Sequence, residues 1–302
     1  MSDAHQSLKA ILYAFLANLG IALAKTWAAL FTGSGSLTAE AIHSFADCGN
    51  QVLLYLGLRQ ARRPPDTEHP LGYGKLTYFW SFIVALLLFS LGGMFSIYEG
   101  WHKLSGHEGL HNPAVGLAIL VVSMVLEGAS LAGCLREIKK QRGGRPLWRW
   151  LRQTRNAELV VVLGEDTAAL VGLSLALAGL GTATLTGDPT YDAMGSIAVG
   201  VVLICISFFV AVHIRTLLVG RSADPEIVAA ITRVIEADPT ILELLNLITL
   251  QFGPDVMVAA KIRMPAQLPL GQAVTSINRL EVAIKRAVPQ VRWSFVEPDE
   301  EK

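Results

Sequence analysis

The sequence predicts a polytopic α-helical membrane protein with six transmembrane helices and a small cytosolic α+β domain, ordered αββαβ, at its C-terminal end. Hydrophobic residues make up 52% of the 302 residues and charged residues only 17%, whereas soluble domains carry about 25% charged residues. The hydrophobic residues gather in long runs, and an ordinary mixture of charges returns after about Gly220. We therefore expect a membrane domain at 1–219 and a small cytosolic domain at 220–302.

Six nearly charge-free runs predict the six membrane helices. Each run reaches the ~20 residues that a helix needs to cross a ~30 Å hydrocarbon core. The runs cover residues 10–32, 37–58, 77–98, 113–135, 157–181 and 190–219. The three cysteines are far apart and form no CxxC pair, which excludes a disulfide scaffold and a zinc finger. The formal net charge of zero gives no indication of nucleic-acid binding.

The basic residues of the loops predict the orientation. Loops 59–76 and 136–156 are rich in Lys and Arg, whereas 33–36 and 182–189 contain none and 99–112 contains only Lys103. Because basic loops stay in the cytoplasm, both chain termini are expected there. This asymmetry fits a bacterial inner membrane, with a eukaryotic organelle as the alternative. The N-terminal segment lacks the Arg-rich appearance of a mitochondrial transit peptide, which favours the bacterial membrane.

The C-terminal domain is expected to contain two helices and three strands. Asp224 followed by Pro225 is typical of a helix start, and this helix should reach about Ala237. Strands are expected at 241–252, 255–264 and 291–296, and a second helix at 271–288. In the second strand, alternation should place residues 256, 258, 260, 262 and 264 on one face, and Val291, Trp293 and Phe295 should share a face in the third.

Charged side chains inside the predicted spans indicate a metal site. His43 and Asp47 lie four residues apart in the second span, so they share one helical face and offer nitrogen and oxygen ligands. Glu165 and Asp166 lie within the fifth span, and two adjacent carboxylates there favour a nearby cation. Adjacent helical positions differ by about 100°, so one of the two is the better ligand. A polar pair that only bonds neighbouring helices remains the alternative for His43 and Asp47.

Other polar residues carry weaker expectations. Glu127 and Lys25 could pair with each other or gate ions, and Asn18 and Asn50 suit hydrogen bonds between helices. Asp188 and Asp192 suit a structural role at the start of the sixth span. The outer-loop histidines could collect metal, but a solvated loop is the preferred interpretation; they are His102, His107 and His111. His213 is expected to snorkel or to cap a helix.

Three segments make the chain resemble the cation diffusion facilitator family. They are AEAIHSFADCGNQ at 39–51, EHPLGYGK at 68–75 and DPTYDAMGS at 188–196. Members of this family are homodimeric exporters of Zn²⁺ and related ions that use proton antiport. The resemblance implies a transport site formed by His43 and Asp47 with residues of span five.

The fifth span departs from the family pattern of His-x-x-x-Asp. Aligning on Asp166 places Val162 at the position of the histidine. The chain therefore looks like a variant branch in which Glu165-Asp166 offers a carboxylate in place of the imidazole. Of these two acids, Asp166 is the preferred ligand. More oxygen ligands favour Mn²⁺, Fe²⁺ or Co²⁺, and family frequency favours Zn²⁺.

Two further metal sites of the family are weakened or missing. Asp66 and His69 match a second metal site, but Tyr73 takes the place of its other histidine. Residues 224–302 contain no His and no Cys, so the domain is expected to serve dimerisation alone. Lys75 resembles a lysine that forms an ion pair between subunits, but the position beside Gly220 where its partner acid is expected carries none.

Secondary active transport is therefore the expected function, with no resident cofactor. The ion would bind between spans two and five, and His43 would exchange a proton for metal during alternating access. Metal ion, protons, the lipid bilayer and a second copy of the chain are the expected partners. The alternatives are an intramembrane metalloenzyme that activates water with the same ligands and a membrane-anchored adaptor.

Overall fold

The computed structural model describes residues 2–106 and 111–300. The chain forms two compact units. The first contains Met1–Gly57, Trp80–Gly144 and Glu158–His213; the second contains Leu58–Phe79, Arg145–Ala157 and Ile214–Lys302. The predicted boundary at 219/220 thus lies inside the second unit, which also takes in parts of two loops.

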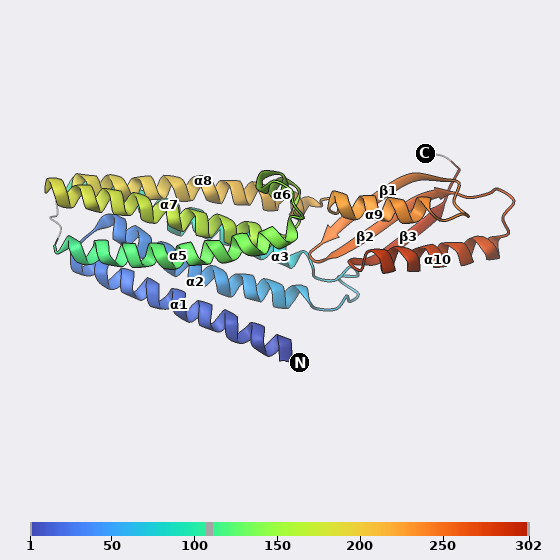
Figure 1. The fold of residues 1–302 in the computed structure, drawn as a ribbon, viewed down its shortest axis with the longest axis horizontal. Coiled ribbons are helices and arrows are strands. Elements are labelled where there is room, and N and C mark those ends of the chain that lie inside the picture. The colour runs from blue at the N-terminus through green and yellow to red at the C-terminus, as the bar shows by residue number, and fades with distance from the viewer. Residues whose placement is uncertain (1, 107–110, 301–302) are drawn as a thin grey trace. The chain divides into compact units, whose positions relative to one another are not determined.

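Long helices build the first unit, and each predicted hydrophobic run lies within one helix or one continuous series of helices. Several of these helices run alongside one another (Figure 1). The helices are α1 (Ser2–Thr32), α2 (Gly35–Ala61), α3 (Leu76–Leu87), the π-helix η1 (Leu88–Met94), α4 (Phe95–Gly106), α5 (Pro113–Gln141), α7 (Ala157–Thr186) and α8 (Thr190–Val219). The sequence did not predict the π-helical turn in the third run.

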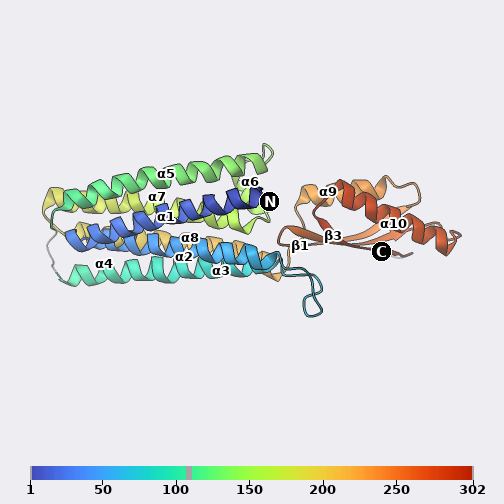
Figure 2. The ribbon, with the colours of Figure 1, turned by 90° about the horizontal axis from the view of Figure 1, so that it is seen from below.

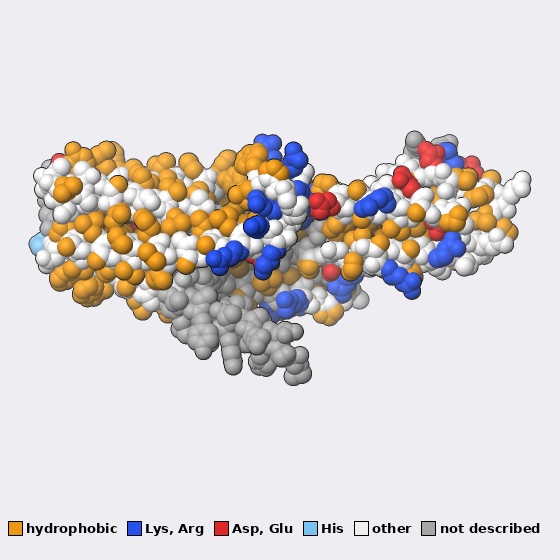
Figure 3. Space-filling view, in the orientation of Figure 1, with side chains coloured by type: hydrophobic (Ala, Val, Ile, Leu, Met, Phe, Trp, Pro, Cys, Tyr) orange, Lys and Arg blue, Asp and Glu red, His pale blue; other side chains and the backbone are white. Residues whose placement is uncertain are grey.

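Four segments of the described residues are long and apolar enough to cross a membrane: Leu76–Ser105, Pro113–Gln141, Ala157–Thr186 and Thr190–Val219. In Pro113–Gln141 only 17% of the most apolar stretch is buried, and many hydrophobic side chains are spread over the visible surface of the helices (Figure 3). The protein is therefore mostly helical with four candidate spans. The count of six stays a prediction, because α1 and α2 are not among these four segments.

The second unit contains the small sheet domain. It consists of α9 (Pro225–Glu236), β1 (Glu243–Phe252), β2 (Asp255–Arg263), α10 (Leu270–Ala287) and β3 (Val291–Pro298). The predicted order αββαβ is confirmed. The strands pair in the order β1-β2-β3, antiparallel and then parallel, and α9 and α10 lie on the same side of the sheet (Figure 2). The short helix α6 (Leu147–Gln153) in the basic loop was not predicted.

The alternation expected in β2 is confirmed, but the face expected for β3 is wrong. Val256, Val258, Ala260 and Ile262 are all buried under the two helices. In β3 the register shifts after the pair Val256–Val291, so that Met257 pairs with Trp293. An extra residue in one strand turns the following side chains to the other face. Val291 is therefore in the core, whereas Phe295 is 56% exposed.

Candidate metal centre

The side chains of His43 and Asp47 meet on α2, as the sequence predicted. His43 Nε2 lies 3.5 Å from Asp47 Oδ2, and the imidazole is almost fully buried. The four-residue spacing stacks the two side chains one turn apart. Asn50, one turn further along the same face, donates a hydrogen bond to Glu165 Oε1 of α7 at 2.6 Å. This bond confirms the expectation that Asn50 links two helices.

Glu165 and Asp166 are both buried but contact different helices. Glu165 is bonded to Asn50 of α2 and interacts electrostatically with Asp47. Asp166 Oδ1 accepts a hydrogen bond from Ser130 Oγ of α5 at 3.1 Å. The two side chains point toward different helices because adjacent positions on one helix differ by about 100°. Of the two carboxylates, Glu165 is the one bonded to the helix that carries His43 and Asp47.

A further carboxylate, Glu127 of α5, faces the same region. It lies one turn from Ser130 and is close enough to interact electrostatically with His43, Asp47 and both acids of α7. The sequence left open a pair between Glu127 and Lys25. Lys25 instead forms an ion pair with Glu40, at 3.2 Å between Lys25 Nζ and Glu40 Oε2.

Buried atoms without a hydrogen-bond partner concentrate in this region. Of the nine such side-chain atoms in the described residues, six belong to α2 or to Asp166. They are Glu40 Oε1, His43 Nδ1, His43 Nε2, Asp47 Oδ1, Asn50 Oδ1 and Asp166 Oδ2. Buried polar groups normally find partners, so this concentration is typical of a site that takes a ligand. Within the described part of the chain, however, no three His, Cys, Asp or Glu side chains stand close enough together to hold one ion.

The π-helix η1 passes beside His43. A Cβ atom on Gly92 would lie 3.9 Å from His43 Nδ1 and 3.2 Å from Leu203 of α8. π-helical turns inside α-helices are frequent at functional sites. No periodicity in the sequence indicated this turn; the pair Gly92-Gly93 was the available signal.

Asp192 of α8 holds the start of α2 in place. Its carboxylate accepts hydrogen bonds from Ser34 Oγ at 2.7 Å, from Gly35 N at 2.6 Å, and from the N–H and hydroxyl of Ser36. The carboxylate is buried. The expected structural role is therefore correct, but the helix that Asp192 caps is α2 and not its own. Asp188 caps α8, since its Oδ1 accepts the Thr190 N–H.

The Asp66 carboxylate in the loop after α2 is already engaged by its own loop. Tyr73 Oη donates to Asp66 Oδ2 at 2.6 Å, and the backbone N–H groups of Glu68 and His69 donate to Oδ1. The Tyr73 hydroxyl, followed by the His69 N–H, holds the pKa of Asp66 below its ordinary value. Tyr73, which takes the place of the other histidine of the family's second metal site, thus donates a hydrogen bond to the Asp66 carboxylate.

The remaining expected residues are dispersed. Lys75 donates to the Leu218 carbonyl at 3.5 Å and lies 4.9 Å from the Phe252 ring centroid. His102 lies beside Tyr98, and the His111 N–H donates to the Thr32 carbonyl. His107 lies outside the described residues.

Comparisons with known proteins agree with the sequence resemblance. Residues 11–219 match the model of the cation efflux transmembrane domain. The chain is 34% identical over 259 residues, 85% of its length, to the "Proton-coupled zinc antiporter SLC30A9, mitochondrial" of Xenopus laevis, and covers 45% of that relative. It is 26% identical over 266 residues to "Cation-efflux pump FieF" of Serratia proteamaculans, covering 85% of this chain and 81% of the pump.

A third relative is "Metal tolerance protein C4" of Arabidopsis thaliana, 33% identical over 74% of this chain and 49% of that protein. Among solved structures, "MamM-CTD 215-293" matches 26% of this chain and 96% of its own, at 16% identity and a TM-score of 0.24.

The chain spans about half the length of the mitochondrial and plant relatives. The family description and the relatives' names indicate a membrane transporter and not an enzyme, and they give no support to the metalloenzyme alternative. The chain therefore belongs to the cation diffusion facilitator, or cation efflux, family.

Proposed function

We propose that the chain exports a divalent metal ion from the cytoplasm by proton antiport with alternating access. α1, α2, the series α3–η1–α4, α5, α7 and α8 would form six spans, with both termini in the cytoplasm. Membership of the cation efflux family supports this proposal. The single observation that carries it is the concentration of buried, unpartnered nitrogen and oxygen atoms on α2 opposite the acids of α7.

The proposed ligands are His43, Asp47, Glu165 and Asp166, with Glu165 ahead of Asp166. Glu165 is bonded to α2 one turn from Asp47, whereas Asp166 is bonded to α5. A divalent ion would replace the Asn50–Glu165 bond and draw the carboxylates of α2 and α7 together, because like charges at one place need a cation between them. Asp66 and His69 remain a minor candidate site.

Zn²⁺ is the first candidate substrate because a relative named as a zinc antiporter is similar over most of this chain. Oxygen-rich ligand sets also accept Mn²⁺, Fe²⁺ and Co²⁺, and this site would offer three carboxylates and one imidazole. Metal binds only the neutral imidazole of His43, so metal and proton compete for it. Protons that enter from the outer side would therefore release the metal there and travel inward.

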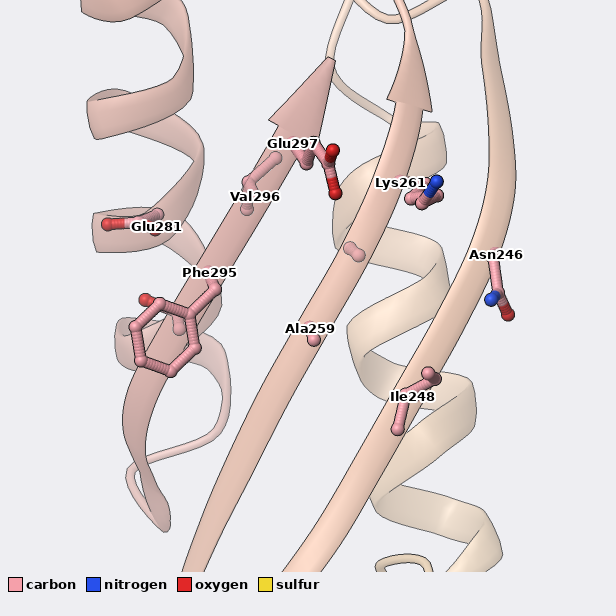
Figure 4. Close-up of a pocket in the computed structure, with 10 residues that line it drawn as sticks. Asn246, Ile248, Ala259, Lys261, Glu281, Phe295, Val296 and Glu297 are labelled. Carbon is pink, nitrogen blue, oxygen red and sulfur yellow. The ribbon is translucent and has the colours of Figure 1, made fainter. Parts of the chain in front are cut away.

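The sheet domain would hold two copies of the chain together. One face of its sheet is covered by α9 and α10, and the other exposes Ile248 and Phe295 at 55% and 56%. These side chains lie with Ala259 on the open face (Figure 4). Burying such a patch against a second copy would remove apolar surface from water. Removing residues 221–302 should then weaken dimers without abolishing metal binding in the helices.

A bacterial inner membrane is the proposed location, from the distribution of Lys and Arg between the loops. Relatives named as mitochondrial make a mitochondrial membrane the second candidate. Protease accessibility of the chain termini in sealed inner-membrane vesicles tests the proposed orientation.

Metal flux into proteoliposomes under an imposed pH gradient tests the function. Zn²⁺, Mn²⁺, Fe²⁺ and Co²⁺ are offered separately to the wild type, Asp47→Ala and the surface control Glu137→Gln. We expect the wild type and Glu137→Gln to move at least one ion, and Asp47→Ala to move none. If no ion moves, or if Asp47→Ala transports as well as the wild type, the proposal is wrong. A greater loss with Asp166→Ala than with Glu165→Ala would reverse the order of the two ligands.

A further inference from the structure

A fully buried cation lies beside the proposed metal site. The side chains of Lys25 and Glu40 have no exposed surface, and Lys25 Nζ is 3.2 Å from Glu40 Oε2. Lys25 also donates a hydrogen bond to Ser44 Oγ at 2.8 Å. Its charge interacts electrostatically with His43 and Asp47. The Lys25 ammonium therefore lies close enough to residues proposed to hold a metal cation to interact with them electrostatically.

Glu40 extends the row of unpaired groups along α2. Glu40, His43, Asp47 and Asn50 are separated by three, four and three residues, which places them on one face of the helix. Each of the four has a buried nitrogen or oxygen without a hydrogen-bond partner. The row therefore continues beyond His43 for one turn, toward the N-terminal end of α2. This is the end that the loop charges place outside.

The second oxygen of Glu40 faces α7. A Cβ atom on Gly172 would lie 2.6 Å from Glu40 Oε1, so the missing side chain at this position makes room for the carboxylate. Oε2 is bonded to Lys25, whereas Oε1 has no hydrogen-bond partner. The Glu40 carboxylate is thus only half satisfied, although it is fully buried.

A contribution to folding stability is a poor explanation for the buried ion pair between Lys25 and Glu40. Replacing a buried ion pair by apolar residues of similar size is often neutral or stabilising, because two charges must be taken out of water. Ionisable groups inside membrane helices instead mark the paths of ions and protons. The position of this pair, one turn from His43, is therefore the informative feature.

We infer that Glu40 is an additional ligand for the metal ion as it leaves His43 toward the N-terminal end of α2, and that Lys25 is the counter-ion that returns to Glu40 afterwards. This inference rests on the proposed transport function. The Lys25 ammonium and the metal ion compete for one carboxylate. Lys25 therefore lowers the affinity for the metal and speeds its release.

Charge-removing variants of the full chain in proteoliposomes test this role, with Zn²⁺ as the probe for equilibrium binding and for flux. Lys25→Met should bind Zn²⁺ about tenfold more tightly, and Glu40→Gln about tenfold more weakly, because each removes one charge beside the site. Both should transport more slowly. The exposed ion pair Lys140–Glu137 on α5, 3.0 Å between Nζ and Oε2, supplies the matched controls Lys140→Met and Glu137→Gln, which should change neither quantity.

Opposite changes in affinity separate this role from a structural one, which would lower thermal stability without moving affinity in two directions. Folded single variants that bind Zn²⁺ within about twofold of the wild type overturn the inference. If the single variants do not fold, the double variant Lys25→Met/Glu40→Gln decides, since it keeps the net charge. For this double variant, slow Zn²⁺ flux with wild-type Zn²⁺ affinity supports the inference, and wild-type flux overturns it. If Asp47→Ala binds Zn²⁺ like the wild type, the proposed function itself fails.

Discussion

Replacing Asp192 should loosen the end of α2 nearest the metal site. In Asp192→Ala, the backbone N–H groups of Gly35 and Ser36 lose their acceptor, and so do the hydroxyls of Ser34 and Ser36. The two hydroxyls lie 3.2 Å apart and can bond to each other, so the two backbone donors dominate the loss. Each buried unpaired donor costs ~1–3 kcal/mol, which gives ~2–6 kcal/mol for the pair.

The net loss of unfolding free energy in Asp192→Ala should fall in the lower part of that range. The desolvation cost of the buried Asp192 carboxylate disappears together with the side chain, which leaves ~2–4 kcal/mol of destabilisation. Asp192→Asn keeps one acceptor oxygen and should lose about half as much. Asp188→Asn is the matched control, because asparagine caps a helix as well as aspartate does.

Unfolding of the full chain in detergent micelles by increasing SDS, followed by far-ultraviolet circular dichroism, measures these free energies. The expected order of destabilisation is Asp192→Ala, then Asp192→Asn, then Asp188→Asn with a change below ~0.5 kcal/mol. An Asp192→Ala variant as stable as Asp188→Asn would refute the conclusion that Asp192 holds the start of α2.

The remaining predictions concern the second unit. Tyr73→Phe should raise the pKa of Asp66 toward 3.8, as measured by NMR titration. Because the folded protein lowers this pKa, the Asp66 carboxylate stabilises its loop above pH 3.8 and loses this effect as the pH falls through the lowered pKa. An unchanged pKa in Tyr73→Phe would contradict the Tyr73–Asp66 hydrogen bond. Gly74→Ala would place Cβ 2.5 Å from the Phe252 carbonyl oxygen and should destabilise by ~1–3 kcal/mol in thermal unfolding; unaltered stability would contradict that packing. Ile231→Ala should lose ~2–5 kcal/mol by the same assay, and a smaller loss would argue against a closely packed core.

Local patterns in the sequence predicted the helices and the order of the sheet domain. The long apolar runs and the alternation of residues 256–262 depend on neighbouring residues alone, so they could be interpreted without the fold. His43 and Asp47 were found in the same way, because a four-residue spacing fixes a shared helical face. The bulge in β3 escaped prediction because its register depends on pairing with β2.

The partners of the buried charges could not be predicted. Lys25 pairs with Glu40 and not with Glu127, and this choice depends on how α1 packs against α2. The division of Glu165 and Asp166 between α2 and α5 depends on the rotation of α7 about its axis, which an almost wholly apolar helix does not reveal in its sequence. Tertiary packing therefore decides which charges belong to the site.

Locating the bound ion in the full-length protein tests the central claim most directly. Anomalous diffraction at the zinc edge from crystals grown with Zn²⁺ would show its position independently of any transport assay. We expect a peak between α2 and α7, bounded by His43, Asp47 and Glu165, that disappears in Asp47→Ala. A peak confined to Asp66 and His69, or one between the helices that persists in Asp47→Ala, would contradict the account.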